Sequence, residues 1–429
     1  MFPRSMPSRA GPNPRAVMDI LYRCCAGLDV HKKTVVACVR RLDAAGKARQ
    51  EIRTFGTMTC DLLALSDWLA EQGVEQVAME STGVFWKPVF NILEGRLAVM
   101  LVNAQHIKQV PGRKTDVKDC AWIAQLLQHG LLRASFVPPP PIRQLRDLTR
   151  QRAQLVAEKA TAANRIQKVL EDANIKLASV ATDVLGVSGR DMLEAIIAGE
   201  EDAEKLADKA RKRLRHKIPA LQTALCGRVT EHHRFQLRLL LDHVSHLEEL
   251  IGRLGRRIEE VMAPFAEAVE RLTTIPGVEQ RAAETVIAEI GPNMEQFPSA
   301  DHLASWAGMC PGNNESAGKR KSGRTTKGSR WLRQILTQAA WAASHTKDTY
   351  LAAQYRRLAA RRGKKRALVA LGHTLLVVMY HLLKQRTTYQ ELGGDFLERL
   401  EPDRQTRQLV KRLEKLGHNV ILQPKEDAA

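Results

Sequence analysis

The chain has 429 residues, of which 44% are apolar, and it carries a formal net charge of +19 at pH 7. This length allows about two to four domains with cores of their own, and the apolar fraction excludes a generally disordered protein. So large a positive charge has little use in an enzyme of small metabolites, but it attracts and holds a polyphosphate such as nucleic acid. An anionic membrane is the competing partner. The basic residues, however, are spread along the whole chain rather than gathered on one amphipathic segment.

The seven cysteines are scattered and include no Cys-x-x-Cys pair. This usage is typical of a reducing compartment and argues against a disulfide framework or a zinc finger. Residues 1–22 are rich in Pro and Arg near their start, so we expect a disordered extension rather than a secretory signal. The most apolar run, residues 367–383, is short for a membrane span and contains two histidines, so we interpret it as a buried helix. We therefore expect a cytoplasmic protein with no membrane partner.

The first part of the chain alternates strand and helix signals. β-Branched residues alternate in CCAGLDVHKKTVVACVR (24–40), and a DAAG turn signal follows, which predicts a hairpin and a further strand. After it come segments with helical spacing, short apolar runs typical of buried strands, and an amphipathic helix that begins at Asp116. Strands first, then strands alternating with helices, predict an α/β domain over residues 23–138, and the prolines at 138–141 form a stiff linker after it.

Residues 139–266 have a different, helical pattern. Apolar residues recur in steps of four and three at Leu240, Val244, Leu247, Ile251, Leu254, Ile258, Val261 and Phe265. Such a heptad seam is typical of a coiled coil, and the alternative is a single amphipathic helix on a helical bundle. In either case we interpret this region as an α-helical arm rather than a catalytic site.

We expect a mostly α-helical domain over residues 267–392, followed by a charged tail at 393–429. The domain opens with two helical stretches hinged at Pro276-Gly277, which resembles a helix–hairpin–helix element. In such an element the backbone amides near Gly277 approach a phosphate backbone, whereas the alternative is an ordinary helical turn. Residues 312–333 then form a glycine-rich loop with seven basic residues and one acidic residue, and residues 356–366 form a second basic run.

Four acidic residues stand out by their position in the α/β domain. Asp29 lies in the first predicted strand, Glu80 ends another, and Asp116 and Asp119 lie three residues apart at the start of a helix. Strand ends and the start of a packed helix can converge, and carboxylates within about 5 Å of one another persist only with cations or shared protons. Oxygen ligands suit Mg²⁺ or Mn²⁺, which can assist phosphoryl transfer. Each acid alone is better explained as a structural residue, such as a helix cap or a response to a helix dipole, so the prediction depends on the set of four.

Five motifs in order, GLDVHK, MESTGVFW, KTDVKD, IPGV and PGNNESAGKRKSGRTTKGSRWLR, resemble the DEDD-type insertion-sequence transposases, which are related to the Piv DNA invertase. The resemblance covers roughly residues 24–390. It implies a RuvC-like domain with the RNase H fold, a helical coiled-coil region and a C-terminal domain that bears a serine. It also implies a bacterial, nucleoid-associated recombinase.

The resemblance also assigns site residues. Asp29, Glu80, Asp116 and Asp119 match the metal site, and Ser316 falls where the family keeps its nucleophilic serine. Glu315 stands where many members have a second serine. The nearby cations are expected to hold nucleic acid: Lys319, Arg320, Lys321, Arg324, Lys327, Arg330 and Arg333. Ser322 and Ser329 are the alternative serines, of which Ser329 is better explained as a helix cap.

The resemblance further implies element-end and target DNA as substrates, a guide non-coding RNA, and a homo-oligomer whose composite site forms a transient phosphoserine link to DNA. Two other readings stay open. In a RuvC-like nuclease or junction resolvase, water attacks and Ser316 only contacts phosphate. In a non-catalytic nucleic-acid-binding protein, the acids are helix caps and the basic loop only binds nucleic acid.

Overall fold

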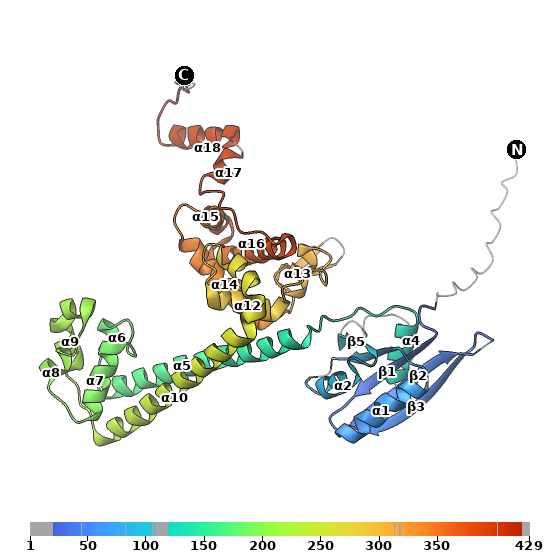
Figure 1. Cartoon of the computed structure of the whole chain (residues 1–429). Helices are drawn as coiled ribbons and strands as arrows, with labels where there is room; N and C mark the ends of the chain where they lie inside the picture. The colour runs from blue at the N-terminus through green and yellow to red at the C-terminus, as the bar shows by residue number, and fades with distance from the viewer. Residues whose placement is uncertain are drawn as a thin grey trace, which may run out of the picture. The chain divides into compact units, whose positions relative to one another are not determined.

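The computed structural model describes residues 20–43, 45–81, 83–104, 107, 119–312, 314–316, 319–400 and 402–422. The chain divides into two compact units between Val137 and Pro138 (Figure 1). The first unit is a mixed α/β domain, and the second is mostly helical, so both parts of the predicted fold class are confirmed at this level.

A five-stranded sheet forms the framework of the first unit. Its strands are β1 (Cys24–Val30), β2 (Thr34–Leu42), β3 (Ala48–Gly56), β4 (Gln76–Glu80) and β5 (Ala98–Val102). Their spatial order is β3-β2-β1-β4-β5. Strands β1 to β3 pair antiparallel, whereas β4 and β5 run parallel to β1. The alternating β-branched residues predicted this meander, and parallel pairing places the carboxyl ends of β1 and β4 at the same edge.

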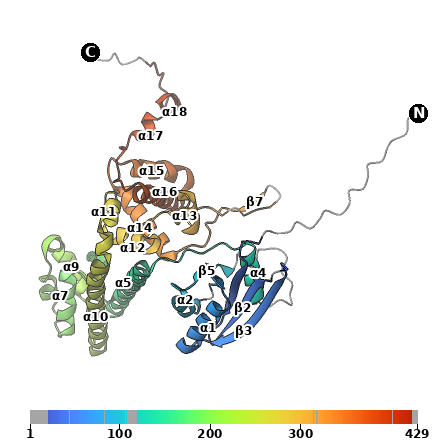
Figure 2. The ribbon, with the colours of Figure 1, turned by 45° about the vertical axis from the view of Figure 1, so that its right-hand side comes forward.

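The two faces of the sheet are covered by different helices (Figure 2). On one face, Leu28 and Met79 pack in the core formed with α1 (Thr59–Glu71) and α2 (Trp86–Leu93). On the other face, Cys25 and Ala78 pack against α4 (Asp119–Gln128). Because side chains alternate along a strand, β1 contributes every second residue to each face.

Gly27 allows α4 to lie directly on β1. A Cβ atom at this position would lie 2.3 Å from the carbonyl oxygen of Cys120 and 2.4 Å from the amide nitrogen of Ala124. Two residues earlier, the Cys25 thiol donates to the Ala124 carbonyl at 3.5 Å. The strand and the helix therefore run in opposite directions. Asp29, on the same face as Gly27, lies toward the start of the helix.

Two long helices form the arm of the second unit. They are α5 (Pro140–Asp172) and α10 (Glu231–Met262), and they lie side by side in both views (Figures 1 and 2). The ion pairs Lys159–Glu248 and His233–Asp172 show that the helices are antiparallel. All eight residues of the predicted seam are buried or half-buried, with Val244, Leu247 and Ile258 buried. The seam therefore faces other protein, while supercoiling of the pair stays a prediction.

Short helices join α5 to α10 and have their own apolar core, which includes Met192, Leu193 and Leu221. They are α6 (Leu177–Val180), α7 (Val187–Ile197), α8 (Ala203–Ala207), the 3-10 helix η1 (Lys212–Lys217) and α9 (Ile218–Leu225). The core continues onto both arm helices through Ile166 and Val244. This cluster therefore fixes the turn of the chain from one arm helix to the other.

The remaining elements form the C-terminal part of the second unit. They are η2 (Ala263–Phe265), α11 (Ala266–Thr273), α12 (Gln280–Ile290), α13 (Ala300–Trp306), β6 (Asn314–Ser316), β7 (Lys319–Ser322), α14 (Arg330–His345), α15 (Tyr350–Arg362), α16 (Lys364–Gln385), α17 (Phe396–Arg399) and α18 (Pro402–Lys415). The expected charged tail thus contains two helices. Within the described part of the chain, α16 is the one helix long and apolar enough to cross a membrane. It packs against α13, α14 and α15 and buries Leu371, Leu375 and Met379, as predicted for a core helix.

Replacing Gly27 by Ala tests the contact between β1 and α4. We expect Gly27→Ala to lower the free energy of unfolding by about 1–3 kcal/mol, because the added methyl group meets backbone atoms that cannot rotate away. Gly255→Ala in α10 is the matched control. No atom lies within 4 Å of its added methyl group, and alanine favours helix by up to about 1 kcal/mol. Urea unfolding followed by circular dichroism measures both, and equal effects at the two sites would contradict the packing argument.

Candidate active site

The carboxyl ends of β1 and β4 bring two of the predicted acids to the same level. The parallel register pairs Leu28 with Met79, so Asp29 and Glu80 follow as the next residues of neighbouring strands. Alternation places both on the face covered by α4, because Cys25 and Ala78 are on that face at even spacing from them. Both acidic residues are half-buried. Sheet register alone therefore places two carboxylates at one edge.

Asp119 reaches the same edge from the helix. It is the first residue of α4, and the next residue, Cys120, lies against Gly27. An acidic residue in the first turn is stabilised by the exposed backbone amides there. Three of the four predicted acids thus lie at the same edge of the sheet, on the face that α4 covers. Each of them belongs to a different element. Asp116 lies outside the described residues.

His31 is a neighbour of this edge that the sequence reasoning did not select. Its Nε2 lies 3.2 Å from Oδ2 of Asp29, and the two side chains are 58% and 23% exposed. The signal that could have found it is the spacing of two residues, which keeps two side chains on one side of an extended chain. A protonated His31 therefore competes with any other cation for Asp29.

The donor chemistry of the edge fits a hard divalent cation, because carboxylate oxygens are the ligands that Mg²⁺ and Mn²⁺ prefer. Among the residues that the structure describes, however, no three His, Cys, Asp or Glu side chains are grouped so as to hold a metal ion. The metal site stays a prediction that needs the fourth acid, Asp116, or a change in side-chain positions.

Ser316 ends the first strand of a small hairpin in the second unit. The expected loop contains β6 and β7, which pair antiparallel and project from the helices (Figure 2). Ser316 is the last residue of β6 and pairs with Lys319. At the base, Pro311 bridges Thr325, and the amide of Gly312 donates to the carbonyl of Arg324 at 2.9 Å. The backbone therefore presents Ser316 at the tip of a hairpin beside a lysine.

The basic residues that are expected to hold nucleic acid lie within this hairpin or shortly after it in the sequence. Lys319, Arg324, Lys327 and Arg330 are exposed, and Arg333 is half-buried and donates to Thr325 Oγ1 at 3.1 Å. The side chains of Arg320 and Lys321 lie outside the described set. Exposed guanidinium and ammonium groups near a hydroxyl can hold a phosphate by charge-assisted hydrogen bonds.

A buried glutamate fixes the end of the hairpin segment. Ser329 caps α14, as predicted, and its hydroxyl donates to Oε2 of Glu289 at 2.9 Å. Arg150 of α5 donates to both oxygens of the same carboxylate, at 2.7 and 2.9 Å. Glu289 is fully buried, so this network joins α5, α12 and the start of α14.

Arg146 completes the network from α5. Its guanidinium donates to the carbonyl oxygen of Glu289 at 2.6 Å. Burial lowers the pKa of Arg146 to about 10, and the nearby carboxylate of Glu289 partly opposes this effect. The arginine remains charged at neutral pH and balances the buried carboxylate. Sequence reasoning missed this network because its partners lie about 140 residues apart.

The Pro276-Gly277 turn joins α11 to α12, as the sequence predicts. Gly277 has φ +82°, and a Cβ atom there would lie 2.3 Å from the amide nitrogen of Ala343 in α14. Close packing therefore gives one reason for glycine at this position. The role of Gly277 in binding a phosphate backbone stays a prediction.

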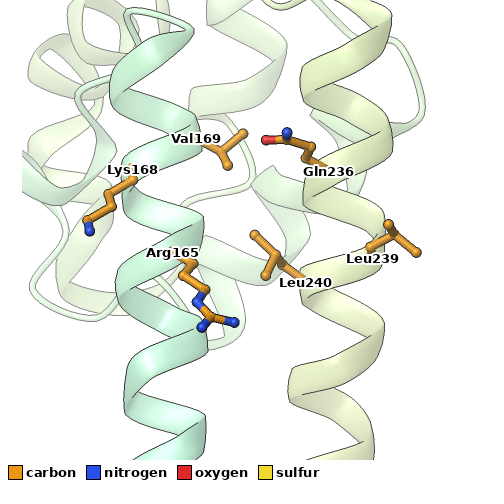
Figure 3. Close-up of a pocket in the computed structure, with 6 residues that line it drawn as sticks. All are labelled: Arg165, Lys168, Val169, Gln236, Leu239 and Leu240. Atoms are coloured by element: carbon orange, nitrogen blue, oxygen red, sulfur yellow. The ribbon is translucent and has the colours of Figure 1, made fainter.

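An open cleft on the arm contains none of the predicted site residues. It lies between α5 and α10, and it is lined by Arg165, Lys168, Val169, Gln236, Leu239 and Leu240 (Figure 3). Its walls are mainly aliphatic, with two cations on the α5 side. It offers no carboxylate or hydroxyl for phosphoryl transfer.

Comparison with known proteins gives two family matches, in different parts of the chain. Residues 26–175 match a family described as "Transposase", of the DEDD type found in IS110. Residues 269–356 match a family described as "Transposase IS116/IS110/IS902 family". The first match contains the acidic edge, and the second contains the serine hairpin.

Individual relatives agree with these matches. The transposase for insertion sequence element IS1111A of Coxiella burnetii is 24% identical over 305 residues, which are 68% of this chain and 73% of the relative. The pilin gene-inverting protein of Moraxella bovis is 26% identical over 35% of this chain and 48% of the relative. An uncharacterized 42 kDa protein of insertion element IS900 from Mycobacterium paratuberculosis is 27% identical over 85% of this chain and 96% of the relative.

The two matched domains and these relatives define a DNA transposase, an enzyme of DNA recombination. Within that class, the chain belongs to the IS110/IS116/IS902 family of insertion-sequence transposases, because both domains of that family are present in order.

The Glu289 network generates a stability prediction. We expect Glu289→Ala to lower the free energy of unfolding of the second unit by about 3 kcal/mol, because Arg150 loses both carboxylate hydrogen bonds and Arg146 loses a carboxylate 4.0 Å away. Glu260→Ala is the control, since its ion pair with Arg257 is exposed on both sides and contributes less than about 1 kcal/mol. Urea unfolding followed by circular dichroism measures both, and a small effect for Glu289→Ala would show that the network does not anchor α14.

Proposed function

We propose that this transposase cuts and rejoins the DNA strands of a mobile element with Ser316 as its nucleophile and a divalent cation at the acidic edge. Asp29, Glu80, Asp116 and Asp119 would hold Mg²⁺ or Mn²⁺. The observation that carries the proposal is the common edge: the register of β1 with β4 and the start of α4 supply three carboxylates from distant parts of the chain. The mixed sheet is consistent with the RuvC-like form of the RNase H fold that we propose for the first unit.

The chemistry divides into two balanced transfers. The Oγ atom of Ser316 forms a bond to a DNA phosphorus while one phosphorus–oxygen bond of the backbone breaks. The serine proton passes to a base, and the displaced DNA oxygen takes up a proton. In the second transfer, a hydroxyl group of another strand attacks the phosphoserine and releases Ser316. Each transfer breaks one phosphate ester bond and forms another, so rejoining needs no external energy source.

The chain's own cations support the first transfer. Lys319, which pairs with Ser316 across the hairpin, and Arg324 near its base can orient the phosphate and balance its growing negative charge. A bound divalent cation would supply further charge neutralisation and activate the attacking oxygen. A serine hydroxyl needs such help because its own pKa is high.

We also propose that the working enzyme is a homo-oligomer guided by a non-coding RNA. The acids and the serine belong to separate units, so the serine of one copy can serve the acidic edge of the same copy or of another. The charge of +19 is consistent with binding to both DNA and a guide RNA. Such an enzyme would act in the bacterial nucleoid.

Replacing the serine tests the nucleophile. We expect Ser316→Ala to lower the formation of covalent protein–DNA adducts by about a thousandfold or more, because no other group forms the phosphoserine bond. DNA binding should stay within about twofold. Denaturing gels with end-labelled DNA measure the adduct, and Ser322→Ala, in the same hairpin, is the control and should still form it. Strand cutting that persists in Ser316→Ala would show that water attacks, as in a metal-dependent nuclease.

Replacing an acid tests the metal edge. We expect Asp29→Asn to reduce DNA cutting by about a thousandfold, because a neutral amide weakens cation binding and charge neutralisation. Titration calorimetry with Mn²⁺ should show the corresponding loss of binding. Asp67→Asn is the control, because Asp67 lies on α1, across the sheet, and pairs with Arg96. Cutting by Asp29→Asn at the normal rate would contradict the proposal.

A further inference from the structure

The helix that follows the serine hairpin has one exposed face. Arg330, Gln334, Gln338, Trp341 and His345 are all exposed and are spaced by four, four, three and four residues along α14. This spacing places the five side chains on one face of the helix. We call this set the α14 face. It extends for about 22 Å, the length of about six nucleotides of a strand, from the end of the hairpin segment.

Trp341 is the unusual member of the α14 face. Its side chain is 58% exposed, and its ring lies 4.5 Å from the ring of His345. A large aromatic side chain at the surface exposes apolar area that water does not favour. The two rings are tilted by 41° to each other, and the exposed indole ring is of the kind on which an unpaired base stacks.

The two glutamines lie beside a narrow groove. Its walls come from α5, α12 and α14 and include Thr149, Arg150, Thr285, Trp331, Gln334 and Gln338. Amide and hydroxyl groups such as these donate to and accept from base edges, and a glutamine can bind adenine with two hydrogen bonds. Arg330, at the start of the face, lies over the ring of Trp331 at 4.4 Å and keeps its charge near the hairpin.

The charge of the surrounding segment favours a nucleic-acid occupant over a second protein. Residues 316–347 contain eight Lys or Arg residues and no Asp or Glu. A protein interface of an already basic chain with itself would bring like charges together, whereas a phosphate backbone is attracted to the same segment.

We infer that the α14 face binds an unpaired stretch of the nucleic-acid strand that adjoins the phosphate attacked by Ser316. Trp341 stacks on a base, Gln334 and Gln338 bind base edges, and Arg330 binds a phosphate. Strand exchange requires bases to leave their duplex partners, and a stacking platform beside the nucleophile stabilises that state. The inference rests on the proposed function and specifies where its substrate strand lies.

Equilibrium binding tests the α14 face without requiring catalysis. The probes are fluorescent 20-nucleotide single strands of DNA and RNA with the same sequence, and the corresponding DNA duplex. We expect Trp341→Ala to weaken binding of a single-stranded probe about tenfold, and the duplex by less than about twofold, because stacking needs an open base. Trp341→Phe should restore most of the affinity. The strand that Ser316 attacks is DNA, so the single-stranded DNA probe should show this loss, and a loss with the RNA probe alone would contradict the inference.

Salt dependence separates stacking from charge. Trp341→Ala removes no cation, so the slope of log affinity against log salt concentration should stay unchanged, whereas Arg330→Ala should reduce it by about one. Phe235→Ala is the matched control, since Phe235 is equally exposed, at 62%, but lies on the arm helix α10. It should bind all three probes normally.

Two outcomes would overturn the inference. In the first, Trp341→Ala and Gln338→Ala bind both single strands as well as the unchanged protein. In the second, Trp341→Ala changes the oligomeric state in light scattering but not probe affinity, which would make the face a protein interface. Because binding does not use the Ser316 hydroxyl, either outcome leaves the nucleophile proposal standing. A failed adduct test would remove the link to a phosphate attacked by Ser316, while the probe measurements would still decide whether the α14 face binds unpaired bases.

Discussion

The close contact between Gly27 and the backbone of α4 is the constraint on which the acidic edge depends. Without a side chain at this position, the helix lies directly on β1 and runs back along it, so the helix starts where the strand ends. The parallel register of β4 then adds Glu80 beside Asp29. Carboxylates repel one another when they come close, so we propose that a cation offsets this repulsion in the working enzyme.

The second unit uses buried charge for a different purpose. Glu289 has no access to water, yet it binds two arginines of the arm and the serine that caps α14. Breaking such a network leaves buried charges without partners. The network therefore fixes the position of α5 relative to the start of α14, where the hairpin segment ends. Apolar packing alone tolerates small displacements of one helix against another more easily. The hairpin that carries Ser316 and the α14 face thus begin from a rigid base.

Much of this fold could be predicted because its signals are local. Alternating residues at 24–40 predicted the meander, and steps of three and four predicted the arm helix. Long-range partners were not predictable in the same way. Nothing in the heptad seam indicates that α5 is its neighbour, and Glu289 and Ser329 are 40 residues apart. The two short strands of the serine segment were also missed, because asparagine, glutamate and lysine have low strand propensity and cross-strand pairing decides the outcome. Of the candidate site, the sequence predicted acids whose elements meet at one edge, but the metal and the role of Ser316 stay predictions.

The most direct test of the central claim is a structure of the enzyme on element DNA with Mn²⁺, recorded at a wavelength where manganese scatters anomalously. The account predicts a manganese peak within about 2.5 Å of carboxylate oxygens of Asp29, Glu80 and an acid of α4. It also predicts the Oγ atom of a Ser316, from the same or another copy, next to a DNA phosphorus at that peak. Manganese bound elsewhere, with these acids turned apart and Ser316 far from any phosphate, would contradict it.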